Sequence, residues 1–152
     1  MAQIPDDLPL KKILVPLDGS DSSFRAARYA INIAKMAKAE IICVHAVVNL
    51  PYVEYKSAGL VIARYIEEAK RHAEMWYDEV RSMAAKVGIK VATETVLDVA
   101  SVADSIVNYA ARQEADLIVI GTKGRTGLKR FLLGSVASGV VAHAKCSVLV
   151  VR

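Results

Sequence analysis

The sequence predicts an α/β fold, a three-layer sandwich in which a five-stranded parallel sheet carries helices on both faces. Short apolar runs alternate with longer amphipathic segments, as expected when a helix connects each pair of parallel strands. The 152 residues, of which 54% are hydrophobic and 24% charged, contain no repeat or linker and suit one domain over 1–152. In such a fold a ligand sits beyond the carboxyl ends of the strands, where the strand order reverses.

The first strand and the first helix are predicted over residues 13–39. Residues 13–17 form a short apolar run rich in branched side chains, which is typical of a strand. The run ends at Asp18-Gly19-Ser20-Asp21, a turn with the residue types that cap helix N-termini. The helix that follows extends to about residue 39, and its apolar face comprises Phe24, Ala27, Ile31 and Ala34.

A second strand and a long helix come next. Glu40 opens the strand at 41–48, which Asn49-Leu50-Pro51 breaks, and the stretch up to about Gly59 predicts no element. Apolar or small residues then recur at alternating intervals of four and three until Gly88, a suitable helix C-cap. They are Ile62, Ile66, Ala69, Ala73, Trp76, Val80, Met83 and Val87. A coiled coil is the alternative, but the run is shorter than four heptads, so we favour an amphipathic helix lying on a sheet.

The last third of the chain predicts two more strand-helix units and a final strand. Residues 89–97 alternate as in a third strand, and Asp98 can cap a helix over about 99–114. The inner face of that helix comprises Val99, Ala103, Ile106 and Ala110. Residues 116–121 are almost continuously apolar, as expected for a strand buried on both faces. A short helix over 135 to about 144 and a strand at 147–151 complete the pattern.

The charge is concentrated near the C-terminus. The chain carries 20 Lys+Arg against 16 Asp+Glu, a net charge of +4. Residues 117–152 contain no acidic residue but six basic ones, which gives this segment +6. Such a basic loop favours a small anionic ligand over a nucleic-acid partner, and a merely solvated loop is the alternative.

The segment over 121–135, GTKGRTGLKRFLLGS, has the features of a phosphate-binding loop. Its glycines permit close approach of the backbone to an anion, and the helix start at Ser135 supplies N–H groups and a positive dipole end. The spacing matches neither GxxxxGK[ST] nor GxGxxG. Thr122 and Thr126 suit loop hydrogen bonding better than catalysis.

At three places the chain resembles the universal stress protein family. The spacing Gly121-x2-Gly124-x9-Gly134-Ser135 is similar to that family's ATP-binding signature. The segments KKILVPLDGSDSS, ADLIVIGTKGRTGLKRFLLGSVA and CSVLVVR resemble its first strand and turn, its nucleotide loop and its last strand. Ser147 stands where that family usually has Pro, and Ala100 where it often does.

The resemblance implies an adenine-nucleotide α-hydrolase-like, or Rossmann-like, sandwich that binds one ATP, or ADP or AMP, per subunit. Because no carboxylate follows Asp116, we expect Mg²⁺ to be held chiefly by the phosphates and water. Pro16 and Asp18 would face the adenosine, and the backbone of Ala46 would bond adenine. The residues around the ribose and phosphates would be Gly121, Thr122, Lys123, Gly124, Arg125, Gly127, Gly134, Ser135 and Val136. The strand Ser147–Val151 would pair with its copy in a homodimer.

The resemblance implies a nucleotide-dependent sensor or switch in the stress response. We expect slow or absent hydrolysis, because no carboxylate follows Asp116 and Asp18 is the main candidate left. The alternatives are a slow ATPase, or an interaction module whose loop is empty or takes another phosphate ligand. Asp18 could belong only to a capped turn, and Ser135 could be an ordinary N-cap. His45, His72 and His143 show no metal-like spacing and suit structural roles.

The cellular setting is predicted from what the sequence lacks. Cys43 and Cys146 have no CxxC neighbour, which favours reduced cysteines and a cytoplasmic location. The first residues show no export signal, and no uncharged run reaches the ~18 residues of a membrane span. A downstream protein partner is expected but cannot be named from the residues.

Overall fold

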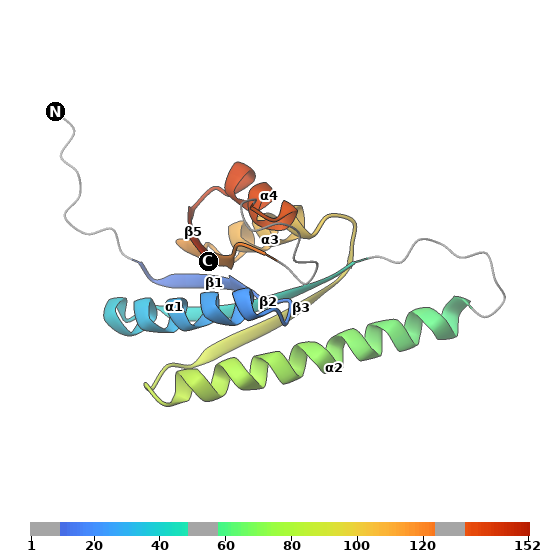
Figure 1. Cartoon of the computed structure of the whole chain (residues 1–152), viewed down its shortest axis with the longest axis horizontal. Coiled ribbons are helices and arrows are strands. Elements are labelled where there is room, and N and C mark those ends of the chain that lie inside the picture. Colours follow the sequence, from blue (N-terminus) through green and yellow to red (C-terminus); the bar gives the residue numbers. More distant parts are fainter. Residues whose placement is uncertain (1–9, 49–57, 124–132) are drawn as a thin grey trace.

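The computed structural model describes residues 10–48, 58–123 and 133–152, in which five parallel strands form one sheet (Figure 1). The strand order is β3-β2-β1-β4-β5, so β1 lies at the centre and the order reverses between β1 and β4. The strands are β1 (Lys12–Pro16), β2 (Glu40–Val48), β3 (Val91–Val99), β4 (Leu117–Gly121) and β5 (Ser147–Val151). The predicted five-stranded parallel sheet is therefore confirmed.

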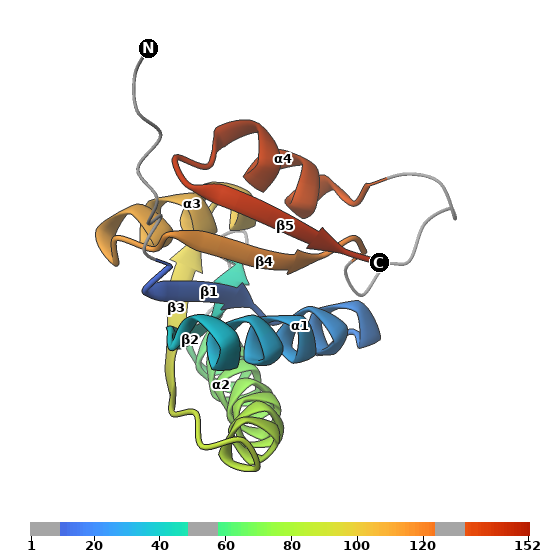
Figure 2. The ribbon, with the colours of Figure 1, turned by 90° about the vertical axis from the view of Figure 1, so that its left-hand side faces the viewer.

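Two helices cover each face of the sheet. They are α1 (Asp21–Ala37) and α2 (Ala58–Ala85) on one face, and α3 (Val102–Arg112) and α4 (Ser135–His143) on the other. Figure 2 shows α4 on the opposite side of the strands from α1 and α2. Within the described residues no helix is long and apolar enough to cross a membrane. The two helical layers bury both faces of the sheet, which explains the nearly continuous apolar strands.

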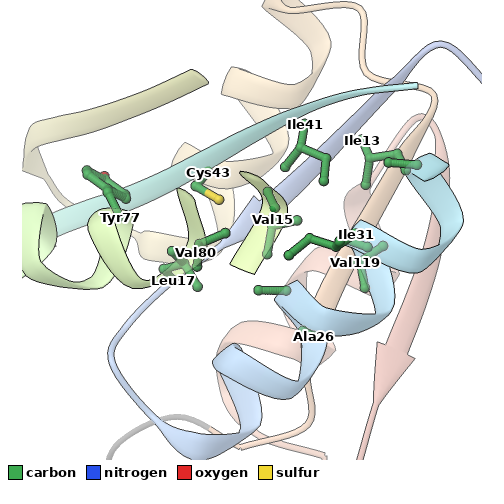
Figure 3. Close-up of a cluster of buried hydrophobic side chains, with 14 of the residues drawn as sticks. Ile13, Val15, Leu17, Ala26, Ile31, Ile41, Cys43, Tyr77, Val80 and Val119 are labelled. Carbon is green, nitrogen blue, oxygen red and sulfur yellow. The ribbon is translucent and has the colours of Figure 1, made fainter. Parts of the chain in front are cut away.

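Alternate residues of the central strands enter two separate cores. Ile13, Val15, Ile41 and Cys43 face α1 and α2, where they pack with helix residues that include Ile31 and Val80 (Figure 3). The intervening residues, Leu14, Ile42 and Val44, pack against α3 and α4. This alternation matters for the site, because it fixes the face to which each residue of β2 belongs.

The prediction that Asp98 caps the third helix is wrong. Strand β3 continues to Val99, which pairs with Val48 and is 6% exposed, so the chain is still extended at position 98. The N-cap of α3 is Ser101, whose side chain accepts a hydrogen bond from the Asp104 N–H at 3.2 Å. The β-branched Val99 gains more from burial in the sheet than from a helix start, and Ser101 supplies the cap three residues later.

The long helix begins and ends earlier than its apolar pattern indicates. It spans Ala58–Ala85, and Gly88 follows its last turn with φ 76°, the left-handed conformation that glycine adopts readily. Ala73 and Val80 are fully buried as the spacing predicts. The pattern missed Tyr77, whose hydroxyl donates to the Glu94 carbonyl at 2.5 Å and is 3.1 Å from Thr95 Oγ1. These bonds connect α2 to β3, and they allow a polar tip to be buried among apolar residues.

We expect the protein to lose stability in alkali. Burial raises the pKa of the Cys43 thiol from 9.0 to about 12, and burial raises the pKa of the Tyr77 phenol from 10.0 to about 12. In the unfolded chain both groups ionise at a lower pH than in the folded protein. The stability that they contribute is therefore complete below pH 9 and is lost as pH rises from 9 to 12. Urea unfolding at pH 8, 9, 10 and 11 should show a falling free energy of unfolding, and a smaller fall in Cys43→Ala. A stability independent of pH across this range would contradict the assignment.

Candidate functional site

A cavity of about 380 Å³ lies at the carboxyl ends of β1, β2 and β4, beside the point where the strand order reverses. This volume lies within the range of small-molecule sites. Its lining residues come from three strand ends and from the first turns of three helices. They are Pro16, Leu17, Asp18, Ser20, Ser23, Val44, His45, Ala46, Val48, Val102, Ile106, Ile120, Gly121, Thr122, Lys123, Gly134, Ser135, Val136 and Ala137.

One side of the cavity is apolar. Val44, Ile120 and Ile106 are buried in the core between the sheet and α3–α4, and their side chains also line the hollow. Val102, at the first residue of α3, extends this wall. Because such a wall has no polar partner to offer, it suits a flat apolar ring rather than a charged group.

The opposite side begins at the turn after β1. Asp18 Oδ1 accepts hydrogen bonds from the Ser20 N–H at 3.0 Å and from the Ser20 hydroxyl at 2.5 Å. Ser20 is also the N-cap of α1, because its Oγ accepts from the Ser23 N–H at 3.1 Å. The capped turn expected from the sequence is therefore present, and it also holds the Asp18 carboxylate at the cavity. Among the described lining residues, Asp18 is the sole acid.

Gly121 brings the end of β4 into direct contact with the first turn of α1. A Cβ at position 121 would lie 2.7 Å from the Ser22 carbonyl carbon and 2.8 Å from its oxygen, so no larger residue fits without moving backbone. The Lys123 N–H then donates to Ser22 Oγ at 3.4 Å. The glycine that the sequence assigns to a phosphate loop thus has a packing role as well.

Two hydrogen bonds fix the residues on either side of the segment 124–132. The Gly134 N–H donates to the Thr122 carbonyl at 2.7 Å, and the Thr122 N–H donates to the Val151 carbonyl at 2.9 Å. The start of α4 is therefore held against the end of β4. Residues 124–132 themselves lie outside the described residues.

Helix α4 begins with its N-terminus at the cavity. Its first intrahelical bond runs from the Ser138 N–H to the Gly134 carbonyl at 2.9 Å, so Ser135, Val136 and Ala137 are the residues whose N–H groups precede the helical ladder. All three line the cavity. The N-cap is Gly134, not Ser135, and it makes no side-chain cap bond. The alternative of Ser135 as an ordinary N-cap is therefore wrong, because Ser135 is already helical.

The structure brings nine of the twelve candidate site residues to this one cavity. They are Pro16, Asp18, Ala46, Gly121, Thr122, Lys123, Gly134, Ser135 and Val136. The other three, Gly124, Arg125 and Gly127, lie outside the described residues. Sequence reasoning missed the apolar wall. Its signal was available in part, since Ile106 stands on the predicted inner face of its helix and Val44 lies in the middle of a predicted strand.

The described residues contain no group of three or more His, Cys, Asp or Glu side chains that could hold a metal ion. His45 Nδ1 lies 2.8 Å from the Leu17 carbonyl oxygen, and His143 Nδ1 lies 2.9 Å from the Gly139 carbonyl oxygen. His72 stacks on Trp76 with ring centroids 6.1 Å apart. Each histidine thus contacts a neighbouring group of the fold.

Comparison with known families agrees with this geometry. The model of the universal stress protein family matches residues 9–152. The chain belongs to this family. Since the match spans nearly the whole chain, it confirms the resemblance drawn from the Gly121–Ser135 spacing and from the first and last strands.

Individual members of the universal stress protein family are similar over most of their length. A universal stress protein of Methanocaldococcus jannaschii is 44% identical over 144 residues, covering 93% of this chain and 82% of the relative. The solved universal stress protein of Lactobacillus plantarum has a TM-score of 0.86 and 29% identity, covering 96% of this chain and 100% of that one. A universal stress protein solved in complex with cAMP has a TM-score of 0.66 and 28% identity, covering 95% of this chain and 98% of that one.

Proposed function

We propose that this universal stress protein binds ATP in the cavity at the ends of β1 and β4 and acts as a nucleotide-dependent sensor or switch. The observation that carries the proposal is the meeting of an apolar wall, one carboxylate and the N-terminus of α4 around a single hollow of about 380 Å³. The relative solved with cAMP supports an adenine nucleotide as the class of ligand. ATP itself, or ADP or AMP, is the finer assignment that experiment must test.

The cavity offers a different chemistry to each part of a nucleotide. The wall of Val44, Ile106 and Ile120 suits the base, with the Ala46 backbone positioned to bond its edge. Both hydrogen bonds that Asp18 accepts within the described residues are made to Oδ1, which leaves Oδ2 to accept from ribose hydroxyls.

The phosphates would lie against α4. The N–H groups of Ser135 and Val136 and the positive end of the helix dipole favour an anion there, and the Ser135 hydroxyl adds a further donor. Lys123 is the one lysine or arginine among the described lining residues, and it follows Thr122, whose carbonyl accepts from the Gly134 N–H at the start of α4. Mg²⁺, where present, would be held chiefly by the phosphates and water.

We expect hydrolysis to be slow. Fast phosphoryl transfer needs a positioned base or water-orienting group, and Asp18, the sole described acid at the cavity, already accepts two hydrogen bonds from Ser20. Turnover measured by released phosphate should stay below ~1 s⁻¹, the low end of typical enzymes. A faster rate that disappears in Asp18→Asn would make the protein a genuine ATPase instead.

The first test is to identify any ligand that stays bound to the protein during purification. Denaturing the purified protein should release an adenine nucleotide that mass spectrometry identifies. ATP added to the nucleotide-free protein should raise its melting temperature, because a ligand that binds only the folded state stabilises it by mass action. No released nucleotide and no thermal shift together would favour the interaction module, whose cavity is empty or takes another phosphate compound.

We also propose a homodimer formed through β5. This strand is last in the sheet order and pairs with β4, so its other edge faces away from the described sheet. An apolar edge strand is stabilised when it is paired, and an antiparallel copy of Ser147–Val151 would pair it. Light scattering should give twice the 16.4 kDa chain mass at micromolar concentration. A mass of one chain would contradict the dimer. The cytoplasmic location and the downstream partner stay predictions.

A further inference from the structure

The indole of Trp76 packs directly on the turn that holds Asp18. Gly19, the residue after Asp18, has φ 79°, and a Cβ built there would lie 2.7 Å from Trp76 Nε1 and would overlap other ring atoms. Only glycine allows the turn and the ring to come this close. A residue of α2 therefore touches the β1–α1 turn from the side of the sheet that α2 covers.

His45 reaches the same turn from β2. Its Nδ1 lies 2.8 Å from the Leu17 carbonyl oxygen, and since a carbonyl only accepts, Nδ1 carries the proton in this contact. The imidazole also meets Trp76 edge to face, with centroids 5.0 Å apart and an interplanar angle of 88°. The two rings thus contact the residues on both sides of Asp18, which are Leu17 and Gly19.

The two rings lie on the sheet face that α2 covers, which is opposite the face of the apolar wall, and His45 also lines the nucleotide cavity. Ile41 and Cys43 of β2 pack in the α1–α2 core, and His45 continues this alternation toward Trp76 of α2. Val44 packs in the α3–α4 core, on the side of the apolar wall. A second cavity of about 280 Å³ adjoins the rings and is lined by both of them together with Tyr65, Glu68 and His72. The rings are therefore closely packed against the turn, whereas on their other side a cavity separates them from Tyr65 and Glu68 of α2.

We propose that His45 and Trp76 are positioning residues for the nucleotide cavity. They hold Leu17 and Gly19 in place, so that the Asp18 carboxylate between them is fixed where it meets the ligand. This inference rests on the proposed nucleotide binding and adds to it the residues that hold the Asp18 carboxylate in position. Preorganisation of this kind raises affinity without adding a contact to the ligand.

The test compares His45→Ala with His72→Ala. His72 is a matched control, since it is also a histidine in contact with Trp76, and no hydrogen bond among the described residues joins it to the turn. We expect His45→Ala to weaken ATP binding about tenfold in equilibrium dialysis, the order of one neutral hydrogen bond. We also expect it to speed amide exchange at residues 17–20 in the nucleotide-free protein. His72→Ala should change neither quantity.

Two further variants separate positioning from general loss of stability. In His45→Asn the side-chain amide N–H can replace Nδ1 as the donor to Leu17, so affinity and exchange should return toward the wild-type values. Val80→Ala creates a cavity in the same core and should lower the melting temperature while leaving ATP affinity unchanged. If affinity simply follows melting temperature across all four variants, the positioning role is overturned.

The two measurements also separate this inference from the function on which it rests. If His45→Ala binds ATP and exchanges amides like the wild type, the positioning role is overturned while nucleotide binding stands. Weaker binding with unchanged exchange would overturn it too, because His45 would then act on the ligand directly. If the wild type binds no ATP, the proposed function fails, and the exchange rates of residues 17–20 alone decide whether the rings hold the turn.

Discussion

Ala46→Phe is expected to weaken ATP binding strongly while leaving the protein folded. Ala46 belongs to β2, lines the cavity and is partly exposed, so a benzyl group placed there projects into the hollow rather than into packed core. A phenyl ring there would occupy the part of the cavity of about 380 Å³ in which the proposed base would lie. We expect the dissociation constant for ATP, measured by calorimetry, to rise by about 100-fold, which corresponds to roughly 2.7 kcal/mol.

The control for this variant is Ala111→Phe. Ala111 is an exposed residue of α3, so the substitution adds the same apolar group to the surface without entering the cavity. Both variants should keep far-ultraviolet circular dichroism like that of the wild type, and only Ala46→Phe should lose the thermal shift with ATP. Unchanged ATP affinity in Ala46→Phe would mean that the ligand binds elsewhere.

Gly121→Ala is expected to cost about 3 kcal/mol of unfolding free energy, the upper end of what overpacking costs. The added Cβ would meet the Ser22 backbone at 2.7 Å, and backbone cannot rotate away as a flexible side chain can. To relieve the contact, the first turn of α1 must move away from β4 and take Ser20 and Ser23 with it. In a chain of this size such a loss lowers the melting temperature by roughly 10 °C.

Gly59→Ala provides the matched control. Gly59 lies in the first turn of α2, and a Cβ there would meet nothing within 4 Å. Because alanine favours a helix more than glycine does, this variant should be as stable as the wild type or slightly more so. Calorimetric melting of the two variants side by side separates the close approach at Gly121 from a general effect of losing a glycine. Equal melting temperatures would show that the α1–β4 contact tolerates a methyl group.

The sequence was sufficient for the fold because periodicity and turn chemistry agree along the chain. The central strands β1 and β4 are buried on both faces, so they read as apolar runs, and Ser20 caps its helix through a local bond. The start of α3 was predicted wrongly because two nearby residues both suit the N-cap. Asp98 and Ser101 both suit an N-cap, and only the pairing of Val99 with Val48 decides between them.

The candidate site was predictable in its polar half and not in its apolar half. Asp18, Gly121 and Ser135 belong to short motifs in which residue type and spacing reveal the chemistry. Ile106 and Val44 look like ordinary core residues, and their exposure to the hollow depends on how α3 sits on the sheet. The contact between Gly19 and Trp76 joins residues far apart in the chain, so no local pattern could reveal it.

The central place of β1 dictates the order in which the molecule can assemble. Its two neighbours are β2, which follows it closely in the chain, and β4, whose Leu117 pairs with Ile13 across about a hundred residues. During synthesis on the ribosome, one edge of β1 therefore stays unpaired until the residues of β4 have been made. Since the cavity also needs β4 and the start of α4, the nucleotide site cannot form until the residues of α4 have been synthesised, and binding cannot assist the folding of the earlier elements.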